Sequence, residues 1–61
     1  MEKVIVYYDG GLFEKYGKLH GGYRAMQGEK VLANNFDDSV RIMAYLTQIL
    51  NIDVSRIEYA F

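Results

Sequence analysis

The feature that most constrains the fold is a short run, residues 4–8, in which every side chain is aliphatic or aromatic. Successive side chains of a strand point to opposite faces, so this run predicts a strand with an apolar set on each face. Val4, Val6 and Tyr8 form one set, and Ile5 and Tyr7 form the other. Such a strand is typical of the interior of a sheet that is covered on both sides.

The rest of the chain predicts three further strands. Residues 9–22 are rich in glycine and predict a loop or wide turn before the second strand. Residues 23–27 and 30–33 predict a hairpin around Gly28-Glu29, because a two-residue link with glycine first suits a type II′ turn. In that register Met26 faces Val31 and Ala25 faces Leu32. Residues 55–61 alternate apolar and polar side chains, which predicts a half-buried strand.

Residues 36–50 predict the one helix. Apolar side chains recur there at helical spacing and fill about half of the helical wheel. They are Phe36, Val40, Ile42, Met43, Leu46, Ile49 and Leu50. Asn34 or Asn35 is expected to cap the first turn, and Asn51 to take the left-handed exit. Asp37 and Asp38 are expected to complement the helix dipole.

These elements predict one small α+β domain over residues 1–61, in the order β-β-β-α-β. The predicted sheet is small and mostly antiparallel, with the helix packed on one face. One helix covers one face only, so the second apolar set of the first strand needs another cover.

The disulfides and zinc sites that usually stabilise a very small protein are absent. The 61-residue chain has no cysteine, and its one histidine excludes a multi-histidine zinc site. A domain of this size buries only about 60% of its unfolded surface. We therefore expect a partner chain, and a homodimer is the first prediction. Six tyrosines and three phenylalanines favour it, since aromatics suit surfaces that a complex buries; alternatively, they fill a small core.

Several short motifs resemble those of a known family. They are Asp9-Gly10-Gly11 after the first strand, Gly21-Gly22-Tyr23-Arg24-Ala25 at the second, and Ala33-Asn34-Asn35 before a helix that carries Asp38. In this order they resemble the N-terminal half of a ribonuclease H-like domain, over nearly all of this chain. The resemblance implies that Asp9 and Asp38 match metal-binding carboxylates. It also implies that Asn34 and Asn35 match a pair that contacts a nucleic-acid strand.

The resemblance implies an alternative function, a Mg²⁺- or Mn²⁺-dependent nuclease or a truncated remnant of one. Two-metal hydrolysis needs several converging carboxylates. The family's third carboxylate closes the fourth strand, where this chain has Glu58-Tyr59-Ala60-Phe61. Asp9 and Asp38 alone would bind Mg²⁺ weakly. They also have plain structural interpretations, a turn residue and a helix-start residue, so we expect no cofactor and no catalysis by this chain.

One segment combines cations with aromatic side chains. It contains Lys15, Tyr16, Lys18, His20, Tyr23 and Arg24. Cations attract phosphates or acidic side chains and aromatic rings offer a stacking face, so these are candidate binding residues. A solvated loop is the alternative. The sequence pI near 5.6 is lower than that of dedicated nucleic-acid modules, which favours a protein partner.

The sequence thus predicts a small self-associating interaction protein without catalysis. We expect a regulator or inhibitor, of the kind that phages encode, that binds a macromolecular partner through an aromatic-rich surface and the basic loop. No apolar run approaches the roughly 18 residues of a membrane span and no signal peptide precedes Val4, so a cytoplasmic protein without membrane contact is expected.

Overall fold

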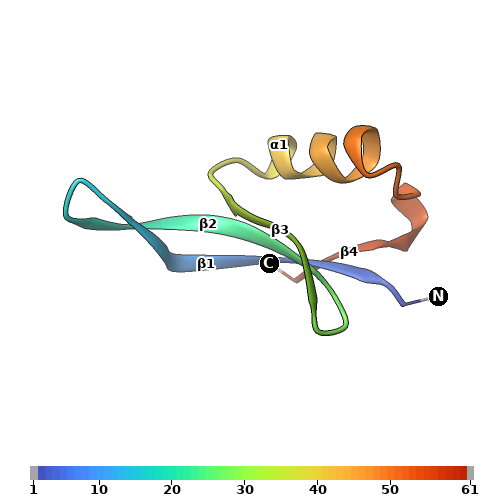
Figure 1. Ribbon diagram of the computed structural model, residues 1–61, viewed down its shortest axis with the longest axis horizontal. Helices are drawn as coiled ribbons and strands as arrows, with labels where there is room; N and C mark the ends of the chain where they lie inside the picture. Colours follow the sequence, from blue (N-terminus) through green and yellow to red (C-terminus); the bar gives the residue numbers. More distant parts are fainter. Residues whose placement is uncertain (1, 61) are drawn as a thin grey trace.

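The computed structural model describes residues 2–60, without the side chains of Leu12, Phe13 and Lys15. Four strands form one sheet in the order β3-β2-β1-β4 (Figure 1). They are β1 (Val4–Lys15), β2 (Lys18–Gln27), β3 (Lys30–Phe36) and β4 (Ile57–Ala60). β2 is antiparallel to both β1 and β3, whereas β4 is parallel to β1. The fold is therefore a small α+β fold with a mixed sheet, which confirms the predicted class.

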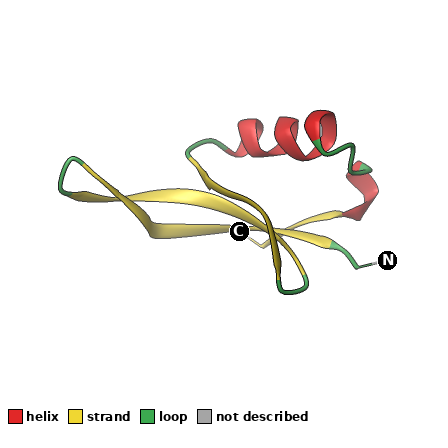
Figure 2. Ribbon diagram, in the orientation of Figure 1, coloured by secondary structure: helices red, strands yellow, loops and turns green. Residues whose placement is uncertain are grey.

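The helix connects β3 to β4 and lies over one face of the sheet (Figure 2). α1 (Ser39–Ala44) continues directly into a π-helical segment, η1 (Tyr45–Ile49), and a 3₁₀ turn, η2 (Val54–Arg56), leads into β4. A connection between strands that run in the same direction must cross the sheet, and this one carries the helix across β2 and β1. The opposite face has no cover from the described part of the chain; we call it the open face.

A small core lies between the helix and the sheet. Its buried residues are Val4, Val6, Ala25, Ala33, Ile42, Leu46 and Ile57. One apolar set of the first strand is therefore buried as predicted. The other set lies on the open face, where the Tyr7 side chain is 42% exposed. The prediction that β1 is buried on both faces is wrong for a single chain, because the one α-helix among the described residues covers one side.

The loop predicted for residues 9–22 is wrong. β1 continues to Lys15, β2 starts at Lys18, and a two-residue turn joins them. Tyr16 and Gly17 have φ angles of 54° and 75°, and positive values at both central positions are those of a type I′ turn. The register changes from Asp9 opposite Gly22 to Phe13 opposite His20. The glycine-rich stretch therefore forms a bulge within a long hairpin rather than a loop.

The second hairpin is confirmed. Gly28 has φ of 60°, as the first position of a type II′ turn requires, and Met26 pairs with Val31. Ala25, however, pairs with Ala33 and not with Leu32, because the register shifts by a bulge between the pairs.

The helix begins later than predicted. Phe36 ends β3, and Asn34 and Asn35 lie in that strand, so neither asparagine caps the helix. Asp38 is the N-cap instead: its Oδ1 accepts a hydrogen bond from the Val40 N–H at 2.7 Å. Asn51 takes the left-handed exit at φ 55°, as predicted.

The apolar arc of the helix is narrower than predicted. Ile42 and Leu46 are buried and Met43 packs on the core, but Val40 and Ile49 are 74% and 66% exposed. The wider π-helical turn, with the Leu50 N–H donating to the Tyr45 carbonyl, places Ile49 away from the position that 100° per residue gives. No helix in residues 2–60 is long and apolar enough to cross a membrane.

Candidate interaction surface

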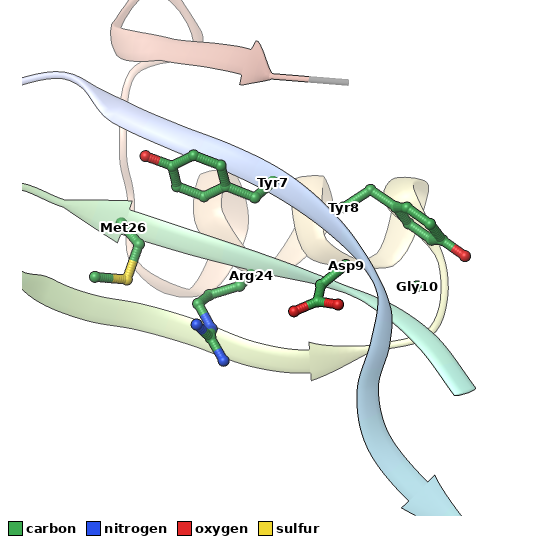
Figure 3. Close-up of a pocket in the computed structure, with 6 residues that line it drawn as sticks. All are labelled: Tyr7, Tyr8, Asp9, Gly10, Arg24 and Met26. Atoms are coloured by element: carbon green, nitrogen blue, oxygen red, sulfur yellow. The ribbon is translucent and has the colours of Figure 1, made fainter. Parts of the chain in front are cut away.

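The open face carries a hollow where β1 and β2 pair. Tyr7 lies opposite Arg24 in the antiparallel register. Figure 3 shows Tyr7, Asp9, Arg24 and Met26 projecting from the two strands into this hollow, while the Tyr8 ring extends to the side. The hollow has a volume of about 540 Å³, and we call it the open-face hollow. Its lining residues are Tyr7, Tyr8, Asp9, Gly10, Arg24 and Met26.

Strand alternation explains this arrangement. Residues with odd numbers from Ile5 to Asp9 share one face of β1, because Val4 and Val6 are buried under the helix on the other. Cross-strand partners share a face, so Arg24 and Met26 of β2 join the β1 residues that lie opposite them. The hollow thus follows directly from the hairpin register.

The open-face hollow contains one cation and one anion. The Arg24 Nε donates to the Asn34 Oδ1 at 3.2 Å, which holds the guanidinium against β3. The Asp9 Oδ1 accepts from the Gly11 N–H at 2.9 Å, within the bulge. Among the described side chains, neither Asp9 nor Arg24 forms an ion pair, so both charges are available to a ligand.

The surroundings of the hollow are mixed in character. Lys3 Nζ and Glu58 Oε1 form an exposed ion pair of 2.8 Å across β1 and β4. On the β3 side, Val31 lies opposite Met26 and is half-exposed. The open face therefore has an apolar centre with charges of both signs around it.

The tip of the first hairpin forms a second candidate surface. We call residues 10–22 the arm; Figure 1 shows this ribbon projecting past the end of the helix. The molecule is 39 Å along its longest axis and only 21 and 18 Å along the others. Tyr16, in the turn, is 90% exposed and Leu19 is 70% exposed.

The structure divides the predicted basic segment among three places. Tyr16, Lys18 and His20 belong to the arm, as does the backbone of Lys15. Tyr23 packs on the core side, with its ring 5.2 Å from that of Tyr8 at 61°.

Arg24 lies instead on the open face. Asn34 is its hydrogen-bond partner, and the same Asn34 oxygen accepts from the Asn35 N–H at 2.9 Å. Asn35 adopts φ 60° within β3. The two asparagines thus hold Arg24 and a bend of β3, and they lie apart from the arm residues in the fold.

Both candidate metal-binding carboxylates have local backbone partners. Asp9 accepts from Gly11 at the bulge, and Asp38 accepts from Val40 as the helix cap. Within residues 2–60, no group of three or more His, Cys, Asp or Glu side chains is arranged to hold a metal ion. The geometry suits the turn and cap interpretations of these two residues.

Comparisons with protein-family models, curated proteins and solved structures find no match.

The sequence analysis did not identify Met26 or Tyr7 as site residues, and it considered Asp9 as a metal ligand or a turn residue. No motif within a single strand indicates this grouping. The second hairpin turn was predicted correctly, but the first was not, and only the β1–β2 register places Tyr7 beside Arg24.

Proposed function

We propose that the protein is a small self-associating interaction protein, without catalytic activity of its own, that binds a macromolecular partner through the arm. The observation that carries this proposal is the exposed tip of the arm: Tyr16 and Leu19 are largely exposed, and the ribbon of the arm projects past the end of the helix (Figure 1). A two-stranded ribbon is marginally stable by itself in water. An arm with exposed apolar side chains at its end suits insertion into a groove of another molecule, which would cover it.

The charge of the arm favours a protein partner. Lys15 and Lys18 flank the turn, and Glu14 precedes them. The chain as a whole has a formal net charge of −1, whereas binding to a nucleic-acid backbone depends on Lys and Arg side chains that neutralise phosphates. A shallow acidic groove that accepts Tyr16 between two lysines is the partner surface that fits best. Such a protein would act as a regulator or inhibitor by occupying that groove.

Self-association is supported by the size of the core. Seven hydrophobic residues are buried among those described, and two of them are alanines. A core this small, with no cysteine in the chain, gives little stability, and a second chain would add buried area.

The nuclease alternative is not carried forward as a second function. Asp9 and Asp38 have local backbone partners, and no observation on the described residues favours catalysis over these structural roles.

The test is a binding experiment with a variant that keeps the arm folded. Tyr16→Asn removes the ring and creates the Asn-Gly pair that type I′ turns prefer, so the hairpin should be retained. Immobilised parent protein should capture a defined protein from a lysate of its source, and the Tyr16→Asn variant should lose it. Arg41→Gln, on the exposed surface of the helix, is the matched control and should keep it. Equal capture by all three proteins would contradict the role of the arm.

A second measurement addresses the class of partner. Gel-shift assays with short single- and double-stranded nucleic acids should show no binding at about 150 mM salt. Binding that weakens with salt and is lost in Lys18→Gln would identify a nucleic acid instead.

A further inference from the structure

The open-face hollow contains both a negative and a positive charge, so a partner of a single charge sign could not match it. Asp9 and Arg24 lie on neighbouring strands, two residues apart along the register, because Arg24 faces Tyr7. Residues in this diagonal relation lie about 7–8 Å apart. An acidic ligand would meet Asp9 there and a basic ligand would meet Arg24, and each like-charge contact costs affinity.

A second copy of the same chain matches both charges. In a two-fold interface, if residue i contacts residue j of the partner, then j also contacts i. A two-fold axis that lies in the interface and passes midway between Asp9 and Arg24 places Asp9 of each copy over Arg24 of the other. The charge pattern of the hollow is therefore self-complementary.

Apolar side chains adjoin the charged pair on the open face. Tyr7 and Met26 line the hollow, and Val31 lies beside Met26 on β3. Tyrosine and methionine are enriched at interface centres. Side chains on this face have no helix over them within the described chain, so a second copy would bury them without displacing any element (Figure 2).

We propose that a second copy of this chain covers the open face, with Asp9 of each protomer paired with Arg24 of the other beside Tyr7. The inference rests on the self-association in the proposed function and assigns it a surface. It is independent of what the arm binds.

Reciprocal charge reversal tests this pairing. Arg24→Asp makes both positions acidic, and Asp9→Arg makes both basic, so each variant alone should be a monomer. An equimolar mixture restores an Asp–Arg contact at both positions and should form a heterodimer. Light scattering should give twice the 7.1 kDa of one chain for the parent and the mixture, and 7.1 kDa for each variant alone. Arg41→Asp, with the same charge change on the helix, should remain a dimer.

A second variant protects the test against misfolding, because Asp9→Arg also removes the hydrogen bond from Gly11. Met26→Glu introduces a charge into the apolar part of the open-face hollow, and Met26 has no hydrogen bond to lose among those described. It should be a monomer with the circular dichroism spectrum of the parent. A Met26→Glu variant that remains a dimer, or a mixture of the charge variants that stays monomeric, would overturn the proposal.

The oligomeric state of the parent protein is also a test. A monomer at about 100 µM would overturn the second copy as the occupant. With a monomeric parent, the capture experiment decides what the open face binds. If Tyr16→Asn still captured a protein and Met26→Glu did not, the open face would bind a different partner, and the arm would lose its proposed function as well. Loss of capture by Tyr16→Asn alone, with a monomeric parent, would leave the arm as the binding element and remove only the dimer.

Discussion

At the scale of single residues, short aspartate side chains determine where elements begin and bend. Asp9, Asp38 and Asp53 each accept a hydrogen bond from a backbone N–H two residues ahead. These bonds satisfy donors that the backbone of a bulge or a helix start leaves unpaired. The same property makes aspartate look like a metal ligand in a sequence. Position alone does not separate the two roles, since both favour a carboxylate at the end of a strand or helix.

Asp38 is expected to contribute through its cap. Asp38→Ala should lower the free energy of unfolding by about 1 kcal/mol, because the Val40 N–H loses its acceptor. Asp38→Asn should cost no more than a few tenths of that amount, since asparagine caps helices about as well as aspartate. Urea titrations of the three proteins measure the difference. A large loss in Asp38→Asn would show that the negative charge matters and not the cap.

Divalent metal ions, in contrast to the helix cap, are not expected to affect stability. Millimolar Mg²⁺ or Mn²⁺ should leave the melting temperature of the parent unchanged, because no group of three or more His, Cys, Asp or Glu side chains among the described residues is arranged to hold the ion. A ligand that binds only the folded state would raise it. A rise that disappears in the Asp9→Asn, Asp38→Asn double variant, together with cleavage of an RNA–DNA hybrid, would restore the nuclease interpretation.

Asp53 should make the fold sensitive to acid. The backbone N–H of Ser55 donates to Oδ1 at 2.9 Å and lowers the pKa of Asp53 below its ordinary value of 3.8, with smaller help from the Ser55 side chain and Arg56. A lowered pKa in the folded state adds stability above pH 3.8 that is lost as the pH falls through the folded pKa. Urea midpoints of the parent should therefore decline more steeply below pH 4 than those of Asp53→Asn. Parallel pH profiles would contradict the effect.

At the scale of elements, turn chemistry decided which predictions succeeded. Gly28-Glu29 has glycine at the position that needs a positive φ, so its hairpin could be predicted. The first hairpin places Tyr16 at such a position, and tyrosine gives no signal for it. The glycines nearby are used for a bulge, which is invisible without the register.

The helix shows the limit of periodicity. Its core residues Ile42 and Leu46 could be predicted, because they repeat at the spacing of one turn. Its start could not, since the pattern begins with Phe36, which packs on the same core from the end of β3. The site was harder to predict, because the open-face hollow depends on pairing between strands and not on any motif within one.

Gly17 is expected to be the most restricted residue of the arm. Its φ of 75° is strained for any residue with a Cβ, although the space around it is open. Gly17→Ala should lower stability by about 1 kcal/mol through the backbone alone. Thermal melts of Gly17→Ala against Tyr16→Asn should move in opposite directions, because asparagine relieves the strain at the preceding position. A neutral Gly17→Ala would place the turn in another conformation.

At the scale of the whole molecule, stability depends on a few contacts that join distant parts of the chain. β4 pairs with β1 through four positions, from Val4 opposite Ile57 to Tyr7 opposite Ala60. Ile57 is the one buried residue of β4. The helix and β4 therefore close the fold together, on a core with few large side chains.

Ile57→Ala should be among the most damaging substitutions. Removing a buried isoleucine side chain costs about 2–5 kcal/mol, which approaches the total stability of a small domain. The variant should be largely unfolded at 37 °C by circular dichroism, whereas Val54→Ala, on the exposed neighbouring turn, should melt close to the parent. A well-folded Ile57→Ala would mean that β4 contributes little to the core.

The parallel pairing of β4 with β1 also sets the order in which the protein can fold. Both hairpins join neighbours in sequence, so they can form early and quickly. Val4, by contrast, pairs with Ile57, and closing the long segment between them carries an entropic penalty that local pairs avoid. During synthesis on the ribosome, β1 therefore keeps one unpaired edge until residues 57–60 have emerged. That edge borders the most apolar strand of the chain, so nascent chains should be vulnerable to aggregation at this stage.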